Sequence, residues 1–388
     1  MHYSSYVEIS RSSYNRNVKF LRKLLGPGVR FSSVIKGNAY GHDIATFLPL
    51  AETCGVDHFS VFSAEEALVA DQCRGEKTEL LILGYIDNAE LEWAIDRRIA
   101  FYVPDFNRLK AAEAAARKVN KPARIHLELE TGMNRTGMEG EELERAAGFC
   151  LSNPGCLLVE GICTHLAGAE SVANYLRIQT QFEVFNELCR DLAARGLKGV
   201  IRHVACSAAA LNYPETRLDL ARIGIAQYGY WPNQETHMKY RILAEGEGRI
   251  SKRGPLWGIL RWCTRIMSLK DVKRGDFVGY GNAYQAMRDL RIAAIPVGYY
   301  HGFARNLSNL GNVLVRGRIA PVIGYVNMNM MMIDVTDCPG VEKDDEVVLI
   351  GRQNRHHITV RSFSDLSNYV NYEILVRIPA TIPRVVVD

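Results

Sequence analysis

The stretch that decides the fold is Val29-Arg-Phe-Ser-Ser-Val-Ile-Lys36-Gly-Asn-Ala-Tyr-Gly-His42. It begins as a short run of apolar and small residues, and this run ends at Lys36, directly before a loop that contains two glycines. Runs of this kind are typical of parallel strands that are covered on both faces. The segment therefore predicts a buried strand with a lysine at its carboxyl end.

Seven similar runs follow, and segments with helical character separate them. Two of these segments open with capping-box patterns, Ser63-Ala-Glu-Glu66 and Asp87-Asn-Ala-Glu90. Eight strand–helix units in succession predict an α/β fold of the (β/α)8, TIM-barrel type. The eight expected strands are residues 29–35, 57–62, 79–84, 99–103, 123–130, 157–165, 200–206 and 218–223.

After Met238 the pattern changes to strand-like runs that alternate with turn-like clusters such as Lys273-Arg-Gly-Asp276. This change predicts two domains, a barrel over residues 1–238 and a mainly β domain over residues 239–388, and it leaves room for the first few residues to join the β domain. The expected strands of the second domain are residues 256–269, 277–280, 290–297, 313–326, 330–335, 346–350 and 356–360.

The composition is that of a globular protein, with 47% apolar and 23% charged residues among 388. The formal net charge of +4 is too small to indicate a nucleic-acid-binding surface. The longest stretch without Asp, Glu, Lys or Arg, residues 319–333, is too short to cross a bilayer, and the first residues lack the pattern of a signal peptide. Nine cysteines without a C-x-x-C pair predict reduced thiols, with no disulfide framework and no metal site. We expect a cytoplasmic enzyme with no membrane or nucleic-acid partner.

Polar side chains follow several of the expected barrel strands at the point where each strand ends. In a barrel of this type, functional groups come from the carboxyl ends of the strands and from the loops that follow. Because these ends meet at one mouth, the sequence predicts a site where several of these side chains converge. They are Lys36, the segment Glu130-Thr-Gly-Met-Asn-Arg135, His165, Ser207, and Arg222 with Gly224.

Lys36 has two interpretations. A lysine at a strand end can extend into solvent, but in a partly desolvated mouth its amine can form an imine with an aldehyde such as pyridoxal phosphate (PLP). The loops after the last two strands, where such barrels commonly bind phosphate, contain Ser207-Ala-Ala-Ala and Ile223-Gly-Ile-Ala. The first of these also fits a plain helix N-cap.

The motif Val34-Ile-Lys-Gly-Asn-Ala-Tyr-Gly-His42 closely resembles the lysine signature of alanine racemases, PLP enzymes in which a β domain follows a barrel. The resemblance extends from about residue 5 to residue 384. Further similar motifs occur in the same order, namely Thr131-Gly-Met-Asn-Arg135, Thr164-His165, His203-Val-Ala-Cys-Ser-Ala-Ala209, Arg222-Ile-Gly-Ile225, Gly279-Tyr-Gly281 and Asn371-Tyr-Glu373.

The resemblance implies a role for each matching cofactor residue. Lys36 would carry PLP as an imine, and His165 would lie against the pyridine ring. Tyr40 would bind the phosphate. Taken alone, Tyr40 and His165 each also fit a buried side chain of the core. The other phosphate-binding groups would be Ser207 and the backbone of Gly224 and Ile225.

Arg222 would donate to the pyridine nitrogen, and Arg135 would reach the phenolic oxygen of PLP and the substrate carboxylate. An aspartate at this position would keep the pyridine nitrogen protonated, whereas a guanidinium stays charged and cannot accept that proton. The cofactor would therefore withdraw electrons only weakly. Such a site suits proton exchange at Cα better than reactions that need a long-lived carbanion.

Racemisation needs a proton acceptor on one face of the substrate and a donor on the other. The resemblance assigns these roles to Lys36 and to Tyr280, which would come from the partner subunit of a homodimer with shared active sites. An unperturbed phenol is a poor base at neutral pH, and His203 matches the residue that contacts this tyrosine and Arg222. Taken alone, Tyr280 also fits an aromatic residue of a β-hairpin.

Three departures from the family pattern concern the substrate. Glu128 stands where the family often has a carbamylated lysine, and we expect its carboxylate to supply the same negative charge. Asn327-Met328-Asn329 replaces Cys-Met-Asp near the substrate, where Met328 is the position retained. Ala380 replaces a tyrosine that narrows the pocket, so we expect amino acids bulkier than alanine, such as serine, to be accepted unless Met328 or Tyr284 refills the space.

Two other functions remain open at this point. PLP-dependent decarboxylases of basic amino acids share the domain arrangement, but they use a glycine-rich phosphate loop and an acidic partner for the ring nitrogen. This chain has no Gly-Gly pair and has Arg222 at the matching strand end. A non-catalytic PLP-binding protein built from a barrel alone would need neither the β domain nor Tyr280. The sequence therefore favours a racemase that acts on alanine.

Overall fold

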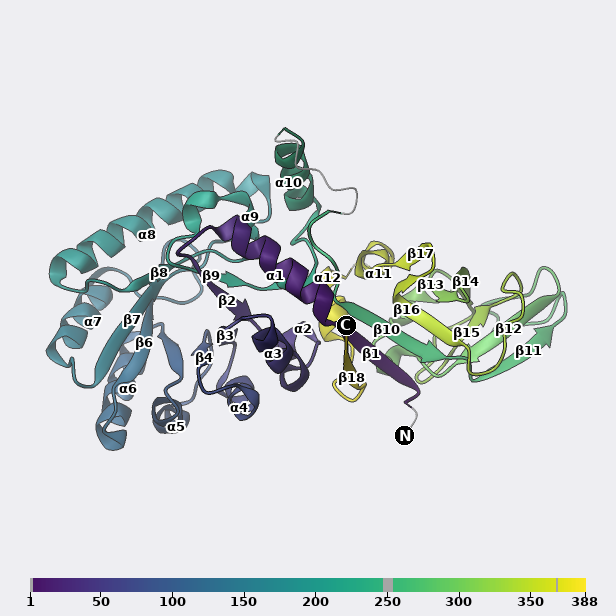
Figure 1. Ribbon diagram of the computed structural model, residues 1–388, viewed down its shortest axis with the longest axis horizontal. Helices are drawn as coiled ribbons and strands as arrows, with labels where there is room; N and C mark the ends of the chain where they lie inside the picture. The colour runs from purple at the N-terminus through teal and green to yellow at the C-terminus, as the bar shows by residue number, and fades with distance from the viewer. Residues whose placement is uncertain (1–2, 247–253, 368) are drawn as a thin grey trace. The chain divides into compact units, whose positions relative to one another are not determined.

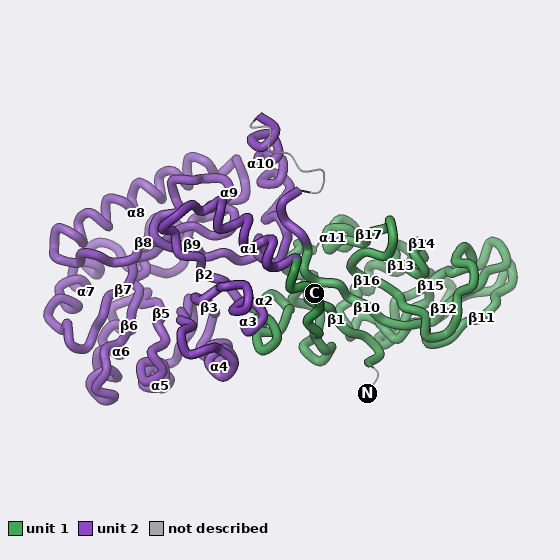
Figure 2. The backbone as a smooth tube through the Cα atoms, in the orientation of Figure 1, with its two compact units in different colours: residues 1–12, 37–47, 258–388 green, residues 13–36, 48–257 purple. Residues whose placement is uncertain are grey.

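The computed structural model describes residues 3–246, 254–367 and 369–388. The chain forms two compact units, one from residues 13–36 and 48–257 and the other from residues 1–12, 37–47 and 258–388 (Figure 2). Each unit is described separately below. The expected domain boundary at residue 238 lies inside helix α10 (Gln234–Gly246), which is part of the first unit.

The first unit contains eight parallel strands that form a nearly closed barrel, as predicted (Figure 1). Their order is β8-β7-β6-β5-β4-β3-β2-β9, and an isolated parallel bridge between Cys206 and Arg222 joins the two ends of this order. Every expected run contains one strand. The strands are β2 (Arg30–Val34), β3 (His58–Val61), β4 (Glu79–Ile82), β5 (Ala100–Val103), β6 (Ala123–Glu128), β7 (Leu157–Cys163), β8 (Ile201–His203) and β9 (Leu220–Ile223).

Helices cover the outside of the barrel (Figure 1). Ser63 and Asp87 begin their helical segments as the capping patterns predicted: each side chain accepts a backbone N–H, and Glu66 and Glu90 bond back to the chain ahead of them. The helical segments are α1 (Arg11–Leu25), α3 (Ile44–Thr53), α4 (Ala64–Cys73), η1 (Asn88–Glu90), α5 (Leu91–Asp96), α6 (Phe106–Val119), α7 (Gly140–Ser152), η2 (Val172–Asn174), α8 (Tyr175–Arg195), α9 (Ser207–Asn212), η3 (Pro214–Thr216), η4 (Ile225–Tyr228) and α10.

The barrel strands are mostly buried because both of their faces are covered. All residues of β3, β5 and β9 are buried, and the buried side chains include polar ones such as His58 and Arg222. Burying a polar group without partners costs free energy, so these side chains need hydrogen bonds within the barrel. These hydrogen bonds hold polar side chains in fixed positions near the barrel mouth.

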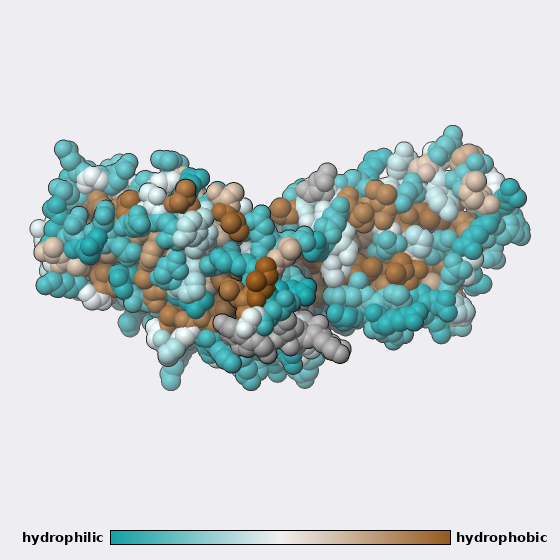
Figure 3. Space-filling view, turned by 90° about the horizontal axis from the view of Figure 1, so that it is seen from above, coloured by the Kyte–Doolittle hydropathy of each residue, from teal (hydrophilic) through white to brown (hydrophobic). Residues whose placement is uncertain are grey.

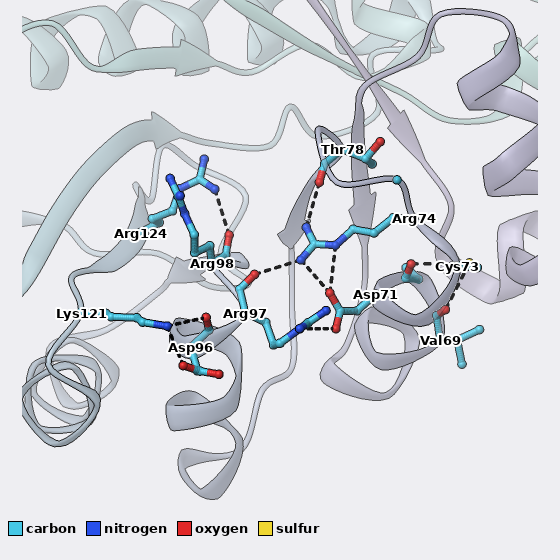
Figure 4. A network of polar contacts seen from close by, with 12 residues as sticks. Val69, Asp71, Cys73, Arg74, Thr78, Asp96, Arg97, Arg98, Lys121 and Arg124 are labelled. Atoms are coloured by element: carbon cyan, nitrogen blue, oxygen red, sulfur yellow. Dashed lines mark hydrogen bonds and ion pairs between the residues drawn. The ribbon is translucent and has the colours of Figure 1, made fainter.

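Ion pairs tie helices to the amino-terminal side of the barrel strands (Figure 4). Asp71 on α4 accepts from Arg74 Nε at 2.9 Å and from Arg97 Nε, beyond α5, at 2.7 Å. Arg74 also donates to the carbonyl oxygen of Thr78, just before β4, and to that of Arg97. The Asp71 side chain is 7% exposed, whereas Asp96, which pairs with Lys121 nearby, is 58% exposed.

The second unit is mainly β, as predicted. Its strands follow the order β11-β12-β15-β14-β13-β16-β10-β1-β18, with β17 paired to β16, and all pairs are antiparallel except β1 with β18. The strands are β1 (Ser5–Ser10), β10 (Leu260–Arg265), β11 (Ser268–Val272), β12 (Leu290–Ile295), β13 (Asn312–Val315), β14 (Arg318–Ile323), β15 (Met331–Asp334), β16 (Glu346–Gln353), β17 (His356–Ile358) and β18 (Arg384–Val387). Its helical segments are η5 (Tyr299–His301), η6 (Arg305–Leu307), α11 (Val360–Ser367) and α12 (Asn371–Val376).

Two expected strands of this unit were wrong. The run 313–326 contains two antiparallel strands, β13 and β14, in place of one. Residues 277–280 form a loop, apart from an isolated bridge between Phe277 and Gln285. Gly279 and Gly281 have φ angles of 78° and 60°, a left-handed backbone that interrupts an extended strand. Two strands that the sequence analysis did not predict, β1 and β18, lie side by side in the sheet.

Mostly hydrophilic side chains cover the face of the molecule in Figure 3, with apolar patches on both units. Scattered exposed apolar residues are normal for a folded protein. In the described part of the chain, no helix combines the length and the apolar character that crossing a bilayer requires.

The Asp71 network predicts a difference between two similar substitutions. Asp71→Asn removes a buried charge between two arginines, and we expect it to lower the free energy of unfolding by about 2 kcal/mol. Asp96→Asn breaks an exposed pair, and we expect it to cost less than about 0.5 kcal/mol. Denaturant unfolding of the two variants measures this difference. Equal losses would show that burial of Asp71 adds nothing to its ion pairs.

Candidate active site

The chain makes an unusual turn immediately after Lys36. In the segment labelled α2 (Lys36–Tyr40), the backbone is left-handed from Gly37 (φ 62°) through Tyr40 (φ 51°). Non-glycine residues pay about 1–2 kcal/mol each for this conformation, so the turn needs support from its surroundings. Part of the support is local, because Asn38 Oδ1 accepts the backbone N–H of Ile44 at 2.8 Å.

Arg384 supplies further support in the second unit. Its guanidinium donates to the carbonyl oxygen of Gly41 at 2.7 and 3.0 Å and to that of Ile378 at 2.8 Å, and further bonds reach the carbonyls of Pro379 and Ile382. Gly41 itself has no room for a side chain, since an added Cβ would lie 2.1 Å from the carbonyl oxygen of Leu375. Arg384 thereby links the turn that carries Tyr40 to the segment that carries Ala380.

Several cationic side chains surround Lys36 at the mouth of the barrel. Lys36 is an exposed residue, but the protein atoms around its amine still desolvate it and lower its pKa, and the nearby positive charges of Arg135 and Arg222 lower the pKa further. The same three cations and burial, which is the larger cause, lower the pKa of His165 to about 3. The mouth therefore holds a neutral histidine and an amine with a lowered pKa, in a positive field that attracts anions.

Arg222 lies on β9 and is buried, with four hydrogen bonds that fix its guanidinium. Nη1 donates to Nδ1 of His203 at 2.5 Å and to the carbonyl oxygen of the same residue at 3.0 Å. Nη2 donates to the carbonyl oxygens of Thr164 at 2.9 Å and Val204 at 3.2 Å. The structure thus brings together Arg222 and His203, and it connects Arg222 to the end of β7.

The loops after β8 and β9 meet at Ser207. Its hydroxyl accepts the backbone N–H of Gly224 at 2.9 Å and that of Ala226 at 3.4 Å. Ile225 lies between these two residues and begins η4. A hydroxyl among closely spaced backbone N–H groups is suited to binding phosphate. The sequence analysis named Ser207, Gly224 and Ile225 but did not include Ala226.

Glu128 lies at the carboxyl end of β6 and is buried. Burial raises the pKa of its carboxyl group, while a hydrogen bond from Thr136 and the positive charges of Arg135 and Arg222 oppose this effect. The carboxyl group is therefore close enough to Arg135 for their charges to interact. This is the neighbourhood that the sequence analysis expected for Glu128.

Glu130 organises the loop that carries Arg135, a function that the sequence analysis missed. Its carboxylate accepts four successive backbone N–H groups, from Gly132 to Arg135, at 2.5–3.4 Å. Burial alone would raise the pKa of Glu130, but these hydrogen bonds prevail and lower it. An acidic residue directly before Thr-Gly-Met-Asn-Arg was the available sequence signal.

The remaining predicted residues belong to the second unit. Tyr280 is 74% exposed and lies between the two left-handed glycines of its loop. Asn327 is half-buried, and its backbone is held by Tyr299 and Met330, whereas the side chains of the two residues that follow it are exposed. Ala380 is also exposed. The exposed side chains in this set are Tyr280, Met328, Asn329 and Ala380.

The described residues contain no group of three or more His, Cys, Asp or Glu side chains that could hold a metal ion. All nine cysteines are free thiols.

The Glu130 contacts predict a pH-dependent stability. Because the folded-state pKa of Glu130 is lowered, its contribution is present above the unfolded pKa of about 4.3 and is lost as the pH falls through the folded value. We expect Glu130→Gln to cost about 2 kcal/mol at pH 7 and to differ little from the wild type at acidic pH, by denaturant unfolding. Glu139→Gln, at an exposed residue whose side chain caps nothing, is the control. A loss that did not depend on pH would contradict this account.

Comparisons with known proteins agree along the whole chain. The family model described as "Alanine racemase, N-terminal domain" matches residues 9–232, and "Alanine racemase, C-terminal domain" matches residues 259–386. The alanine racemase of Leptospira interrogans is 35% identical over 386 residues, which cover 100% of this chain and 96% of that protein. Alanine racemase 1 of Caldanaerobacter subterraneus is 36% identical over 380 residues, covering 98% and 94%.

A solved structure gives the same result. The crystal structure of alanine racemase from Streptomyces lavendulae matches with a TM-score of 0.88 and 27% identity, covering 100% of this chain and 98% of that one. The family models and the relatives cover both units, and the fold agrees with the predicted barrel and β domain. The chain belongs to the alanine racemase family of PLP-dependent isomerases.

Proposed function

We propose that this isomerase racemises alanine with Lys36 and Tyr280 as its two proton-transfer groups. Lys36 serves one face of the substrate, and Tyr280 of the partner subunit serves the other. The observation that carries this proposal is the lowered pKa of Lys36, which lies near the charges of Arg135 and Arg222 at the mouth of the barrel. Lowering the pKa of an amine makes it a more effective proton-transfer group, because more of it is deprotonated at a given pH.

The side chains at the mouth fit PLP. A deprotonated Lys36 amine suits attachment of an aldehyde, and the hydroxyl of Ser207 with the N–H groups of Gly224 and Ala226 suits a phosphate. We infer that Tyr40 also binds the phosphate and that His165, neutral over the physiological pH range, lies against the ring. Bound PLP supplies an electron sink for the carbon that loses the proton.

We infer that Arg222 donates a hydrogen bond to the ring nitrogen of PLP. A guanidinium gives up no proton in the accessible pH range, so Arg222 orients the ring without protonating it. Its contacts with three carbonyl oxygens and with His203 keep it in one orientation. Arg222 therefore limits how far negative charge spreads into the ring, which favours a simple proton exchange.

We infer that Arg135 binds the substrate carboxylate and that the Glu128 carboxylate, close to it, holds it in place. Glu130 supports the same arginine from the backbone side, because its carboxylate gathers the N–H groups of the loop. The planar guanidinium of Arg135 can bind a carboxylate through two parallel hydrogen bonds, and its fixed position makes this recognition specific.

Tyr280 is 74% exposed in the single chain, which fits a residue that completes the active site of a second subunit. We therefore propose a homodimer with two shared sites. The nine free thiols fit a reducing compartment, and we place the enzyme in the cytoplasm.

Solvent isotope exchange tests the proposed chemistry. In D2O, the wild-type enzyme with PLP should incorporate deuterium at the α-carbon of alanine and equilibrate its enantiomers. Lys36→Ala and Tyr280→Phe should each lower the racemisation rate by about 10²–10⁴-fold, because each lacks one proton-transfer group.

Mixing the two inactive variants tests the shared site. Random exchange of subunits makes half of the dimers mixed, with one intact site in each, so activity should return to about a quarter of the wild-type level. Recovery of no activity in exchanged dimers would show that Tyr280 does not act across the interface. Absence of deuterium incorporation by the wild type would refute the proposed reaction.

We propose further that the enzyme accepts amino acids larger than alanine. Ala380 stands where the family pattern has a tyrosine, and neutral Asn327 and Asn329 stand where it has a thiol and a carboxylate, with Met328 between them. The smaller side chain at position 380 leaves space for a larger substrate side chain.

The Ala380→Tyr variant tests this specificity. It should lower kcat/KM for serine by at least about tenfold and change kcat/KM for alanine by less than about threefold, because the added ring occupies the space that a side chain larger than methyl needs. Thr381→Tyr, which adds the same ring at the next exposed residue, is the matched control. A wild-type enzyme that racemises alanine alone would disprove the broader specificity and leave the alanine reaction intact.

A further inference from the structure

Behind Arg222, a chain of hydrogen bonds continues into the barrel through two histidines. Nη1 of Arg222 lies 2.5 Å from Nδ1 of His203, and Nε2 of His203 lies 2.7 Å from Nδ1 of His126. The two imidazole rings meet edge to face, with their centroids 4.9 Å apart. All three side chains are buried, so bulk water does not compete for these hydrogen bonds.

The direction of every hydrogen bond in this chain follows from Arg222. A guanidinium has donors and no acceptor, so Nδ1 of His203 must accept. A neutral imidazole carries one proton, which places the proton of His203 on Nε2 and makes Nδ1 of His126 the acceptor of the next bond. The proton of His126 is then on its own Nε2. Arg222 thereby determines the tautomers of both rings.

Both rings remain neutral over the physiological pH range. Burial is the largest cause of the lowered pKa of His203, followed by the charge of Arg222 and the two neighbouring histidines. For His126, burial, His58, Arg124 and Arg222 together outweigh the opposing charge of Glu79 and lower the pKa to about 3. A protonated His203 would have no lone pair for Arg222, so neutrality is a condition of the contact.

The backbone makes a specific space for the His126 ring. The pairing of β6 with β7 shifts by one residue after Ile125, which places Gly161 opposite His126. An added Cβ on Gly161 would lie 2.2 Å from Nδ1 of His126. The bulge and the missing side chain together allow His126 Nδ1 to face His203. The contact is therefore built into the strand pairing as well as into the side chains.

We propose that His126 is a positioning residue for the reaction: it accepts the Nε2–H of His203 and so keeps Nδ1 of His203 available to hold Arg222. This proposal rests on the proposed role of Arg222 toward the ring nitrogen. Without an acceptor at position 126, the buried N–H of His203 has no partner on that side. The ring can pair that N–H again only by turning toward another acceptor or a water molecule. Turning moves Nδ1 away from Arg222, so the guanidinium loses its only side-chain acceptor among the described residues.

Tautomers can be measured without any turnover. Two-bond ¹H–¹⁵N correlation spectra of protein labelled at histidine with ¹⁵N distinguish the two neutral forms, and they can be recorded with and without PLP. In the wild type, both His203 and His126 should carry their proton on Nε2. In His126→Phe, the ¹⁵Nδ1 signal of His203 should move downfield, toward the value of an imidazole nitrogen without a hydrogen bond, because the bond from Arg222 weakens. His126→Asn, whose Oδ1 can accept in place of Nδ1, should retain the wild-type signal.

Kinetics should follow the same order. His126→Phe should lower kcat by about tenfold or more and leave KM for alanine within about twofold, because Arg222 acts on the ring and Arg135 on the substrate carboxylate. His126→Asn should recover most of the loss. Gly161→Ala, which displaces the ring without removing it, should resemble His126→Phe.

Tyr102→Phe is the matched control for packing. The Tyr102 ring lies 6.3 Å from the ring of His126 and 6.0 Å from that of His203, and its hydroxyl lies beside Cys163, outside the chain. This variant should keep the wild-type tautomers and kcat. A wild-type His203 with its proton on Nδ1, or a His126→Phe variant with an unchanged ¹⁵Nδ1 signal of His203 and unchanged kcat, would overturn the proposal. Correct tautomers in a wild-type protein that does not racemise alanine would refute the proposed function alone.

Discussion

A buried guanidinium whose two Nη groups are both hydrogen-bonded is the constraint on which the barrel mouth depends. Arg222 lies on β9, and its hydrogen bonds reach Thr164 after β7 and His203 at the end of β8. An isolated bridge between Cys206 and Arg222 also joins β9 to the segment after β8. Because a buried cation without acceptors would be costly, these three strand ends must keep their relative positions, and the groups carried by their loops keep theirs.

The barrel was predictable because its strands are buried on both faces and each is followed by a helix with clear signals. The strands β1 and β18 lacked such signals, since each is short and finds its partner at the other end of the chain. The loop at residues 277–280 has the composition of a strand, but Gly279 and Gly281 adopt backbone angles that apolar content alone does not reveal.

The placement of candidate residues at the barrel mouth was predictable where a residue lies at a strand end, as with Lys36, His165 and Arg222. It was not predictable where the chemistry depends on contacts between distant segments. His126 is a single polar residue in an apolar strand, and only the bulge opposite Gly161 explains its position. The role of Arg384 likewise could not be predicted, because it depends on a hydrogen bond to the carbonyl oxygen of Gly41, 343 residues away in the chain.

The left-handed turn after Lys36 has a consequence for how the protein is made. Three non-glycine residues, Asn38 to Tyr40, hold an unfavourable backbone, and the guanidinium that steadies them belongs to the last strand of the sequence. During translation the turn after Lys36 therefore has no clamp until Arg384 has been synthesised and has left the ribosome. Nascent chains that have not reached β18 can form barrel strands early, but this turn is not yet held in place.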